Sequence, residues 1–244
     1  MNDIKKLNRI RIDLYKRVME VPKATPDVAI QYEFGVNDLY MEILMEKVIT
    51  AVEIFQLEEE RIARQLLTRL MRKEVDGFCT EIHAACKILK LESFEKLCEI
   101  EKVRDHLKRK LVKQQEENVF QKMLEGSKTN SVLLSGFDYN GKMKDYLKFL
   151  TFKEAKAVFM LRYRMLPTRT NFPGRWSSSF CGICGNQDTD KHLFHCPGFI
   201  DLLHGLAYEM FFDKEVMKNK EKMRHAAQSV MKVEERLQLL QGMI

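Results

Sequence analysis

The sequence predicts a mainly α protein, in which a multi-helix scaffold is followed by a small cysteine-rich segment and C-terminal helices. Only 5 prolines and 11 glycines interrupt the 244 residues. Leu, Lys, Glu and Met are abundant, and these residues favour helices. Apolar residues also recur at helical spacing along most of the chain. These observations together favour helices over sheets.

The N-terminal part is predicted to hold several helices separated by turns. Residues 3–20 form a basic amphipathic helix, which ends at the two prolines of VPKATP (21–26) because proline cannot continue a helix. A second helix follows Asn37, and a third covers about 58–74. The apolar stripe of the first helix is Leu7, Ile10, Leu14 and Val18. The stripes expected to face inward are Leu39, Ile43, Val48, Val52 and Phe55 in the second helix, and Ile62, Leu66, Leu67 and Leu70 in the third.

A short helix around 78–89 places Cys79, His83 and Cys86 on one face. Such residues can bind a metal, but a fourth ligand is missing and apolar residues lie nearby. We therefore assign these cysteines, and Cys98 with them, to core packing. A long charged helix at about 93–124 is interpreted as a solvated helix laid along the domain. The first region is thus predicted to span 1–126, followed by a polar, turn-rich linker at 127–150.

The next region, 151–212, begins with the capping box Thr151-Phe-Lys-Glu154, which predicts a helix ending before Pro167. An apolar helix is expected at 199–212. The last region, 213–244, is expected to be a helix with a seven-residue repeat: Val216, Met223, Val230, Leu237 and Ile244. This seam across 216–244 fits a coiled coil that would allow self-association, and it fits packing within the chain nearly as well. We slightly favour packing within the chain.

The cysteine-rich segment has the pattern C-x₂-C-x₇-H-x₃-C. Cys181 and Cys184 suit a tight turn that aims two thiolates at one point, and Gly185 after them accepts the positive φ of such a turn. His192 and Cys196 are four residues apart, so on a helix they share one face. These four residues predict a closed site for a structural Zn²⁺ in a small treble-clef-like zinc knuckle. The alternatives are a chance grouping or a disulfide. His195 is the competing imidazole, but on a helix it would point away.

The charge distribution and the search for targeting signals limit the classes of function that the sequence allows. The net charge is +6, and residues 151–197 alone carry seven basic residues against three acidic ones. The N-terminus has no apolar signal region, and no run approaches the ~18 apolar residues of a membrane span. We therefore expect an intracellular protein of the cytoplasm or nucleus, without a membrane partner. In that reducing setting, clustered cysteines more often bind metal than pair.

Two blocks of the chain resemble one family. The segment FMLRYRMLPTRTNFPGRW, running into CGICGNQDTDKHLFHCPGF, resembles the cysteine-and-histidine segment of non-LTR (LINE-type) retrotransposon reverse transcriptases. Upstream, VPKATPDVAIQYEFGVNDLYMEILMEKV resembles the stretch that follows the polymerase thumb in the same proteins. The blocks occur in the family's order, and the resemblance covers about residues 4–235.

The resemblance implies a region outside the polymerase core whose zinc knuckle and basic residues contact template RNA or target DNA. It implies that the zinc ligands are Cys181, Cys184, His192 and Cys196. It also implies that the nucleic-acid backbone is contacted by Arg162, Arg164, Arg169 and Arg175. The paired-aspartate polymerase motif is missing, and Asp213-Lys-Glu215 lacks the spacing of a restriction-like endonuclease. The chain is therefore expected to be a fragment or domesticated descendant without enzymatic activity.

Two functions remain open at this point. The first is a non-catalytic region that binds RNA or DNA, with the four arginines on phosphates and with Phe172 and Trp176 stacking on exposed bases. The alternatives are that these two rings pack beneath the knuckle and that the arginines form an ordinary solvated face. The second function is a zinc-stapled helical scaffold for protein interaction, which would dimerise through the C-terminal helix if the seam pairs between chains. An enzyme comes third, because no nucleophile–base pair, open metal site or phosphate-cradling loop is found.

Overall fold

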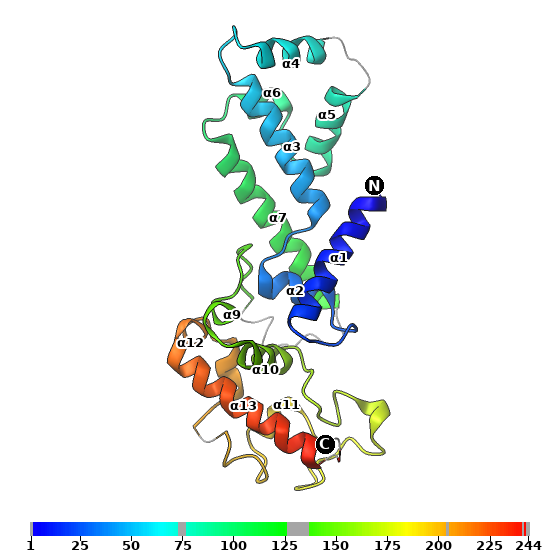
Figure 1. The fold of residues 1–244 in the computed structure, drawn as a ribbon, viewed down its shortest axis with the longest axis vertical. Helices are drawn as coiled ribbons and strands as arrows, with labels where there is room; N and C mark the ends of the chain where they lie inside the picture. Colours follow the sequence, from blue (N-terminus) through cyan, green and yellow to red (C-terminus); the bar gives the residue numbers. More distant parts are fainter. Residues whose placement is uncertain (1, 73–76, 126–136, 204, 241, 243–244) are drawn as a thin grey trace. The chain divides into compact units, whose positions relative to one another are not determined.

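The computed structural model describes residues 2–72, 77–125, 137–203, 205–240 and 242, which form mainly helices joined by turns (Figure 1). Within these ranges no strand is found. The only β pairing among these residues is an isolated antiparallel bridge between Phe180 and Gln187. The mainly α fold class predicted from the sequence is confirmed.

The chain divides into two compact units, each discontinuous in sequence. Unit 1 comprises residues 1–11 and 37–118, and unit 2 comprises residues 12–36 and 119–244. Helices α1 (Asn2–Val18) and α7 (Val103–Glu125) contribute residues to both. The four-part division by chain order stays a prediction. Residues 127–136 of the predicted linker lie outside the described residues, whereas residues 137–150 supply Tyr139, Tyr146 and Leu150 to the core of unit 2.

Unit 1 is built around α3 (Leu39–Phe55). The Asp38 side chain caps it by accepting hydrogen bonds from the backbone N–H groups of Tyr40 and Met41 at 2.9 and 3.3 Å. Helices α4 (Ile62–Arg72), α5 (Phe78–Ile88) and α6 (Phe94–Cys98) surround α3 together with the start of α7. The shared core includes Met45, Val48, Ile49, Val52, Ile82, Leu97 and Leu107. Cys86 is buried in this core, as predicted.

The predicted inner face of the third helix is wrong. Of its four apolar residues only Leu67 is buried in α4, whereas Ile62, Leu66 and Leu70 are 74, 53 and 42% exposed. Because successive helical residues are ~100° apart, Leu67 lies ~100° around the helix from Leu66 and ~140° from Ile62, with Leu70 between Leu66 and Leu67. The helix therefore turns Leu67 inward and leaves an apolar face uncovered. Ile43 of α3 is likewise 42% exposed, although it was expected to face the core.

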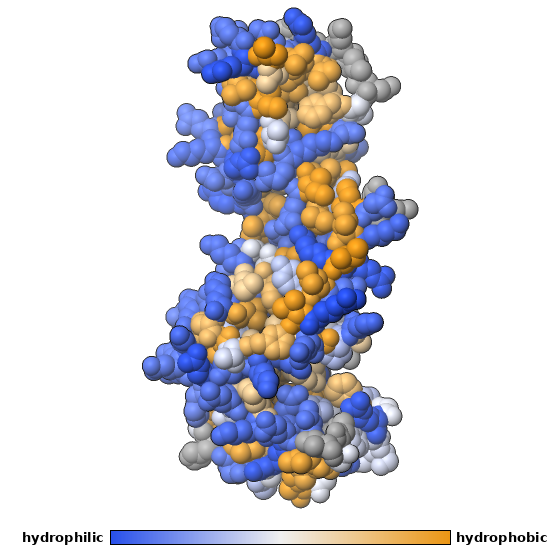
Figure 2. All heavy atoms as spheres, in the orientation of Figure 1, coloured by the Kyte–Doolittle hydropathy of each residue, from blue (hydrophilic) through white to orange (hydrophobic). Residues whose placement is uncertain are grey.

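Helix α1 also carries an uncovered apolar stripe. Its residues Leu7, Ile10, Leu14 and Val18 are all more than half exposed. Figure 2 shows apolar surface along α1 and over α4. The stripe predicted from the sequence is therefore present, and it faces outward.

Unit 2 is organised around α10 (Phe152–Arg162), which is buried on nearly every side. The predicted capping box begins it: the Thr151 N–H donates to Glu154 at 2.8 Å, and Thr151 Oγ1 accepts from the Glu154 N–H at 3.5 Å. Helix α13 (Lys220–Leu240) packs along α10. The core they share includes Val158, Phe159, Leu161, Met223, Ala226, Val230, Val233 and Leu237.

Two helices predicted for the C-terminal region take a different form. Residues 199–203 and 205–207 form turns and irregular backbone, followed by the 3₁₀ helix η2 (Tyr208–Phe212), so the single apolar helix is wrong. Gly205 adopts φ +75°, which ends any continuous helix there. The last helix breaks at Asn219 into α12 (Lys214–Lys218) and α13. The seam residues Met223, Val230 and Leu237 are buried inside unit 2, as expected for packing within the chain, and Ile244 lies outside the described residues.

Candidate metal centre and the adjacent arginine loop

A tight turn presents the first two cysteines of the cluster. The Gly185 N–H donates to the Cys181 carbonyl at 2.9 Å, and the Cys181 N–H donates to the Asn186 carbonyl at 2.6 Å. Gly185 adopts φ +74°, the left-handed conformation that the sequence predicted for it. The antiparallel bridge between Phe180 and Gln187 pairs the residues on either side of this turn. This hairpin fixes the backbone that carries both cysteines.

The second pair of residues comes from the short helix α11 (Asp190–Leu193) and the turn after it. Thr189 caps α11, with its Oγ1 accepting from the His192 N–H at 3.0 Å. Cys196 lies beyond the end of α11, so the expectation that His192 and Cys196 share one helix is wrong. Both residues nevertheless face the two knuckle cysteines.

The four ligand atoms lie within 4.8 Å of one another. Cys196 Sγ is 3.8 Å from Cys181 Sγ and 3.8 Å from Cys184 Sγ, and Cys184 Sγ is 3.2 Å from His192 Nε2. A tetrahedral metal with bonds of ~2.3 Å to sulfur separates its sulfurs by ~3.8 Å. The cluster therefore has the dimensions of a four-coordinate metal site that uses Nε2 of His192. Within the described ranges, no other His, Cys, Asp or Glu group is close enough to hold a metal.

The sulfurs remain thiols or thiolates. All six cysteines are free, and sulfurs 3.8 Å apart are well beyond the ~2.05 Å of a disulfide. A hydrogen bond from the Asn186 backbone, the largest cause, lowers the pKa of Cys184. Burial raises the pKa of Cys196, since desolvation disfavours its thiolate. A cation at the centre would favour all three thiolates.

Two buried aspartates fasten the preceding loop to the knuckle. Asp188 Oδ2 accepts from the Arg169 N–H at 2.8 Å. The Asn171 side-chain amide donates to both carboxylate oxygens of Asp190, at 2.9 and 3.0 Å. Burial raises the pKa of Asp190 to about 7, against the lowering effect of Asn171 and Arg164. The sequence did not predict that Asp188 and Asp190 hold the loop, because these contacts join residues 19 positions apart.

The loop carries two arginine–aromatic pairs. The Arg169 guanidinium lies 5.5 Å from the ring centre of Trp176, and the Arg175 guanidinium lies 5.5 Å from that of Phe172. Trp176 and Phe172 are half-buried, and Arg175 is exposed. The rings are therefore neither fully buried beneath the knuckle nor free on both faces, since one face of each is covered by a guanidinium.

Arg164 and Arg162 differ sharply in exposure. Arg164 is half-exposed at the end of α10, with its Nε 4.0 Å from Asp190 Oδ2. Arg162 is fully buried, and its Nε donates to Glu33 Oε1 at 2.8 Å while its Nη1 donates to the Phe211 carbonyl. The prediction that Arg162 contacts a nucleic-acid backbone is therefore wrong, because no phosphate can reach it. Its charge is already neutralised by Glu33 inside unit 2.

Comparisons of the chain with protein-family models, curated proteins and solved structures found no match. In the parts of the chain that the structure describes, no helix is both long and apolar enough to cross a membrane.

Proposed function

We propose that this chain is a non-catalytic nucleic-acid-binding region derived from a non-LTR retrotransposon reverse transcriptase, with a structural zinc at its Cys₃His centre. The observation that carries the proposal is the loop of arginine–aromatic pairs, which the aspartates of the knuckle hold in place. The two segments that resemble the family supply the assignment of origin.

Zinc is the metal that this donor set favours. Three sulfurs and one imidazole nitrogen suit Zn²⁺ and leave no open coordination position, so the ion would be structural. A hairpin knuckle supplies two ligands, and a short helix and the turn after it supply the other two, which supports a treble-clef-like arrangement. Reduced thiols also suit the cytoplasm or the nucleus.

The metal centre itself would not attract nucleic acid. Three thiolates and a neutral imidazole around Zn²⁺ carry a formal charge near −1, so attraction must come from Arg164, Arg169 and Arg175. A guanidinium that already covers a ring offers its outer face to a base and its N–H groups to a phosphate. The pairs of Arg169 with Trp176 and of Arg175 with Phe172 would thus bind single-stranded RNA or DNA.

The proposal is tested by replacing Arg164, Arg169 and Arg175 with glutamine while Arg162 is kept. The variant should keep its metal and melting temperature but bind RNA and DNA more weakly. On a single strand, the slope of log affinity against log salt should flatten by about 0.7 for each phosphate that is no longer neutralised. A control variant, K122Q/K222Q/K232Q, removes the same charge from exposed sites of unit 2. Equal binding by the two variants would refute the proposed surface.

A second candidate function is a zinc-stapled protein-interaction scaffold. The exposed face of α4, with Ile62, Leu66 and Leu70, is the observation that favours it. The C-terminal seam gives it less support, because Val230 and its neighbours are already buried in unit 2. If light scattering found a dimer that Leu66→Lys converted to a monomer, with nucleic-acid binding absent, the scaffold function would be preferred.

A further inference from the structure

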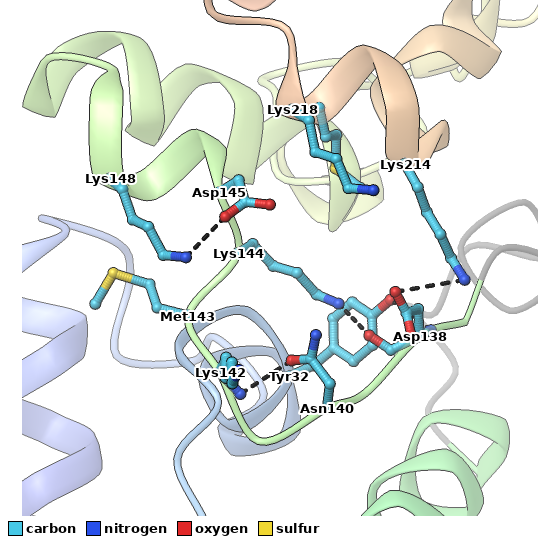
Figure 3. Close-up of a pocket in the computed structure, with 11 residues that line it drawn as sticks. Tyr32, Asp138, Asn140, Lys142, Met143, Lys144, Asp145, Lys148, Lys214 and Lys218 are labelled. Atoms are coloured by element: carbon cyan, nitrogen blue, oxygen red, sulfur yellow. Dashed lines mark hydrogen bonds and ion pairs between the residues drawn. The ribbon is translucent and has the colours of Figure 1, made fainter.

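Unit 2 contains a lysine-lined pocket, defined here by Lys142, Lys144, Lys148, Lys214 and Lys218, that plays no part in the metal centre. Its volume is about 270 Å³. Its walls come from the segment 138–145, from α9 (Tyr146–Phe149) and from α12, with Tyr32 of α2 (Asp27–Phe34) beside them (Figure 3). The pocket therefore joins three segments that are far apart in sequence.

The charge of the lining is strongly positive. Five lysines face two aspartates, Asp138 and Asp145. Lys148 pairs with Asp145 at 2.7 Å and Lys214 with Asp138 at 3.4 Å, as Figure 3 shows. Lys218 pairs with Glu215, an exposed residue outside the lining. The side chain of Lys142 has no hydrogen-bond or ion-pair partner within the described residues. Three carboxylates therefore offset only part of the charge of the five ammonium groups, and the remaining positive charge favours an anionic ligand.

Backbone contacts hold the lysine-bearing segment in place. The Lys144 N–H donates to the Glu33 carbonyl at 2.8 Å, which joins the segment to the end of α2. Gly35 follows with φ +63°, and a Cβ there would lie 2.4 Å from backbone atoms of Lys142. Only glycine permits so close an approach. The positions of Lys142 and Lys144 are therefore fixed by the fold.

The floor of the pocket excludes base stacking as the means of recognition. The Lys144 ammonium sits 4.1 Å from the centre of the Tyr32 ring and donates to the Asp138 carbonyl, so it covers the one aromatic ring of the lining. The four lysines at the rim are exposed, so their ammonium groups can reach a ligand, although all of them except Lys142 already pair with a carboxylate. Ammonium groups bind phosphate as point charges, without demanding bidentate geometry. We propose that the lysine pocket is a binding site for adjacent phosphate groups, supplied by a nucleic-acid strand or by a free polyphosphate.

The inference that a nucleic-acid strand supplies these phosphates rests on the proposed function. The inference that a free polyphosphate supplies them does not. The test compares the full chain with K142Q/K218Q, which keeps the buried Lys144 and both lysine–aspartate pairs. The control K122Q/K232Q removes the same charge from exposed sites of unit 2 outside the pocket. Two probes are titrated at 0.15 M salt: a labelled 12-nucleotide single-stranded RNA and inorganic tripolyphosphate.

The pocket variant should bind both probes about tenfold more weakly than the parent, since it lacks two ammonium groups that each contribute a salt slope of ~0.7. The control should stay within about twofold. A weakening for tripolyphosphate alone supports the free polyphosphate and overturns the strand as the source. A parent that binds tripolyphosphate through the lysines but no RNA or DNA refutes the proposed function and leaves the pocket standing. Equal binding of both probes by K142Q/K218Q and its control overturns the proposal.

Discussion

Replacing Arg162 with glutamine should strongly destabilise unit 2. The Arg162 side chain is 1% exposed and that of Glu33 is 0% exposed, and they form a 2.8 Å ion pair. The Tyr163 hydroxyl donates to the same carboxylate at 3.0 Å. Without the guanidinium, Glu33 would keep the hydrogen bond from Tyr163 but would lose its ion-pair partner, with only the weaker attraction of Lys144, which forms no ion pair with it, remaining.

The expected loss follows from the burial of this pair. Removing one partner of a buried ion pair costs about 3–5 kcal/mol, because the remaining charge is left desolvated and unpaired. For a unit of this size each kcal/mol lowers the melting temperature by roughly 2–4 °C. The R162Q variant should therefore melt about 6–20 °C below the parent. The double variant E33L/R162M should recover most of this loss, because it leaves no unpaired charge.

Thermal unfolding followed by circular dichroism measures the difference. Arg236→Gln is the matched control, since Arg236 pairs with Asp201 at 2.8 Å on the surface and exposed pairs contribute only about 0–1 kcal/mol. If R162Q melted within 2 °C of the parent, the buried pair would not have the role assigned to it. A binding loss in R162Q accompanied by an unchanged melting curve would return Arg162 to the nucleic-acid surface.

Two further substitutions test the packing of unit 2. Val230→Asp should lower its stability by at least about 3 kcal/mol without changing the molecular mass, because Val230 is 1% exposed in the core beside α10; light scattering that showed a dimer becoming a stable monomer would instead support a coiled coil. Gly35→Ala should destabilise unit 2 by roughly 2 kcal/mol or more in a urea titration, because it adds both left-handed strain and a clash with the backbone of Lys142. Gly174→Ala, where a Cβ meets nothing within 4 Å, is its control, and equal midpoints for the two would contradict the close approach.

The parts that sequence predicted well are those set by neighbouring residues. The ligand set of Cys181, Cys184, His192 and Cys196 spans 16 residues, so spacing alone brought the four together. The capping box at Thr151 and the turn at Gly185 are equally local. Helix α2 was missed even though Pro26 precedes its first residue and Gly35 follows its last, which are the usual signals of a helix start and end.

The parts that sequence missed depend on distant partners. Arg162 ends a helix near other arginines, and nothing local distinguishes it from them. Its partner Glu33 lies 129 residues earlier in the chain, so its burial follows only from the tertiary fold. The lysine pocket could not be predicted from the sequence for the same reason, because its lysines lie on separate segments at 142–148 and 214–218. The exposure of the apolar face of α4 was missed for a different reason. Helical periodicity identifies an apolar face but does not show whether another element packs on it.

The most direct test of the central claim is the metal content of the purified chain, measured by elemental analysis alongside C184S and C86S. Cys184 lies within 3.8 Å of a second sulfur and within 3.2 Å of His192 Nε2, whereas Cys86 lies in the core of unit 1. We expect one zinc per chain in the parent and in C86S, and none retained in C184S. A parent without zinc, or a loss of zinc in C86S alone, would contradict the Cys₃His centre.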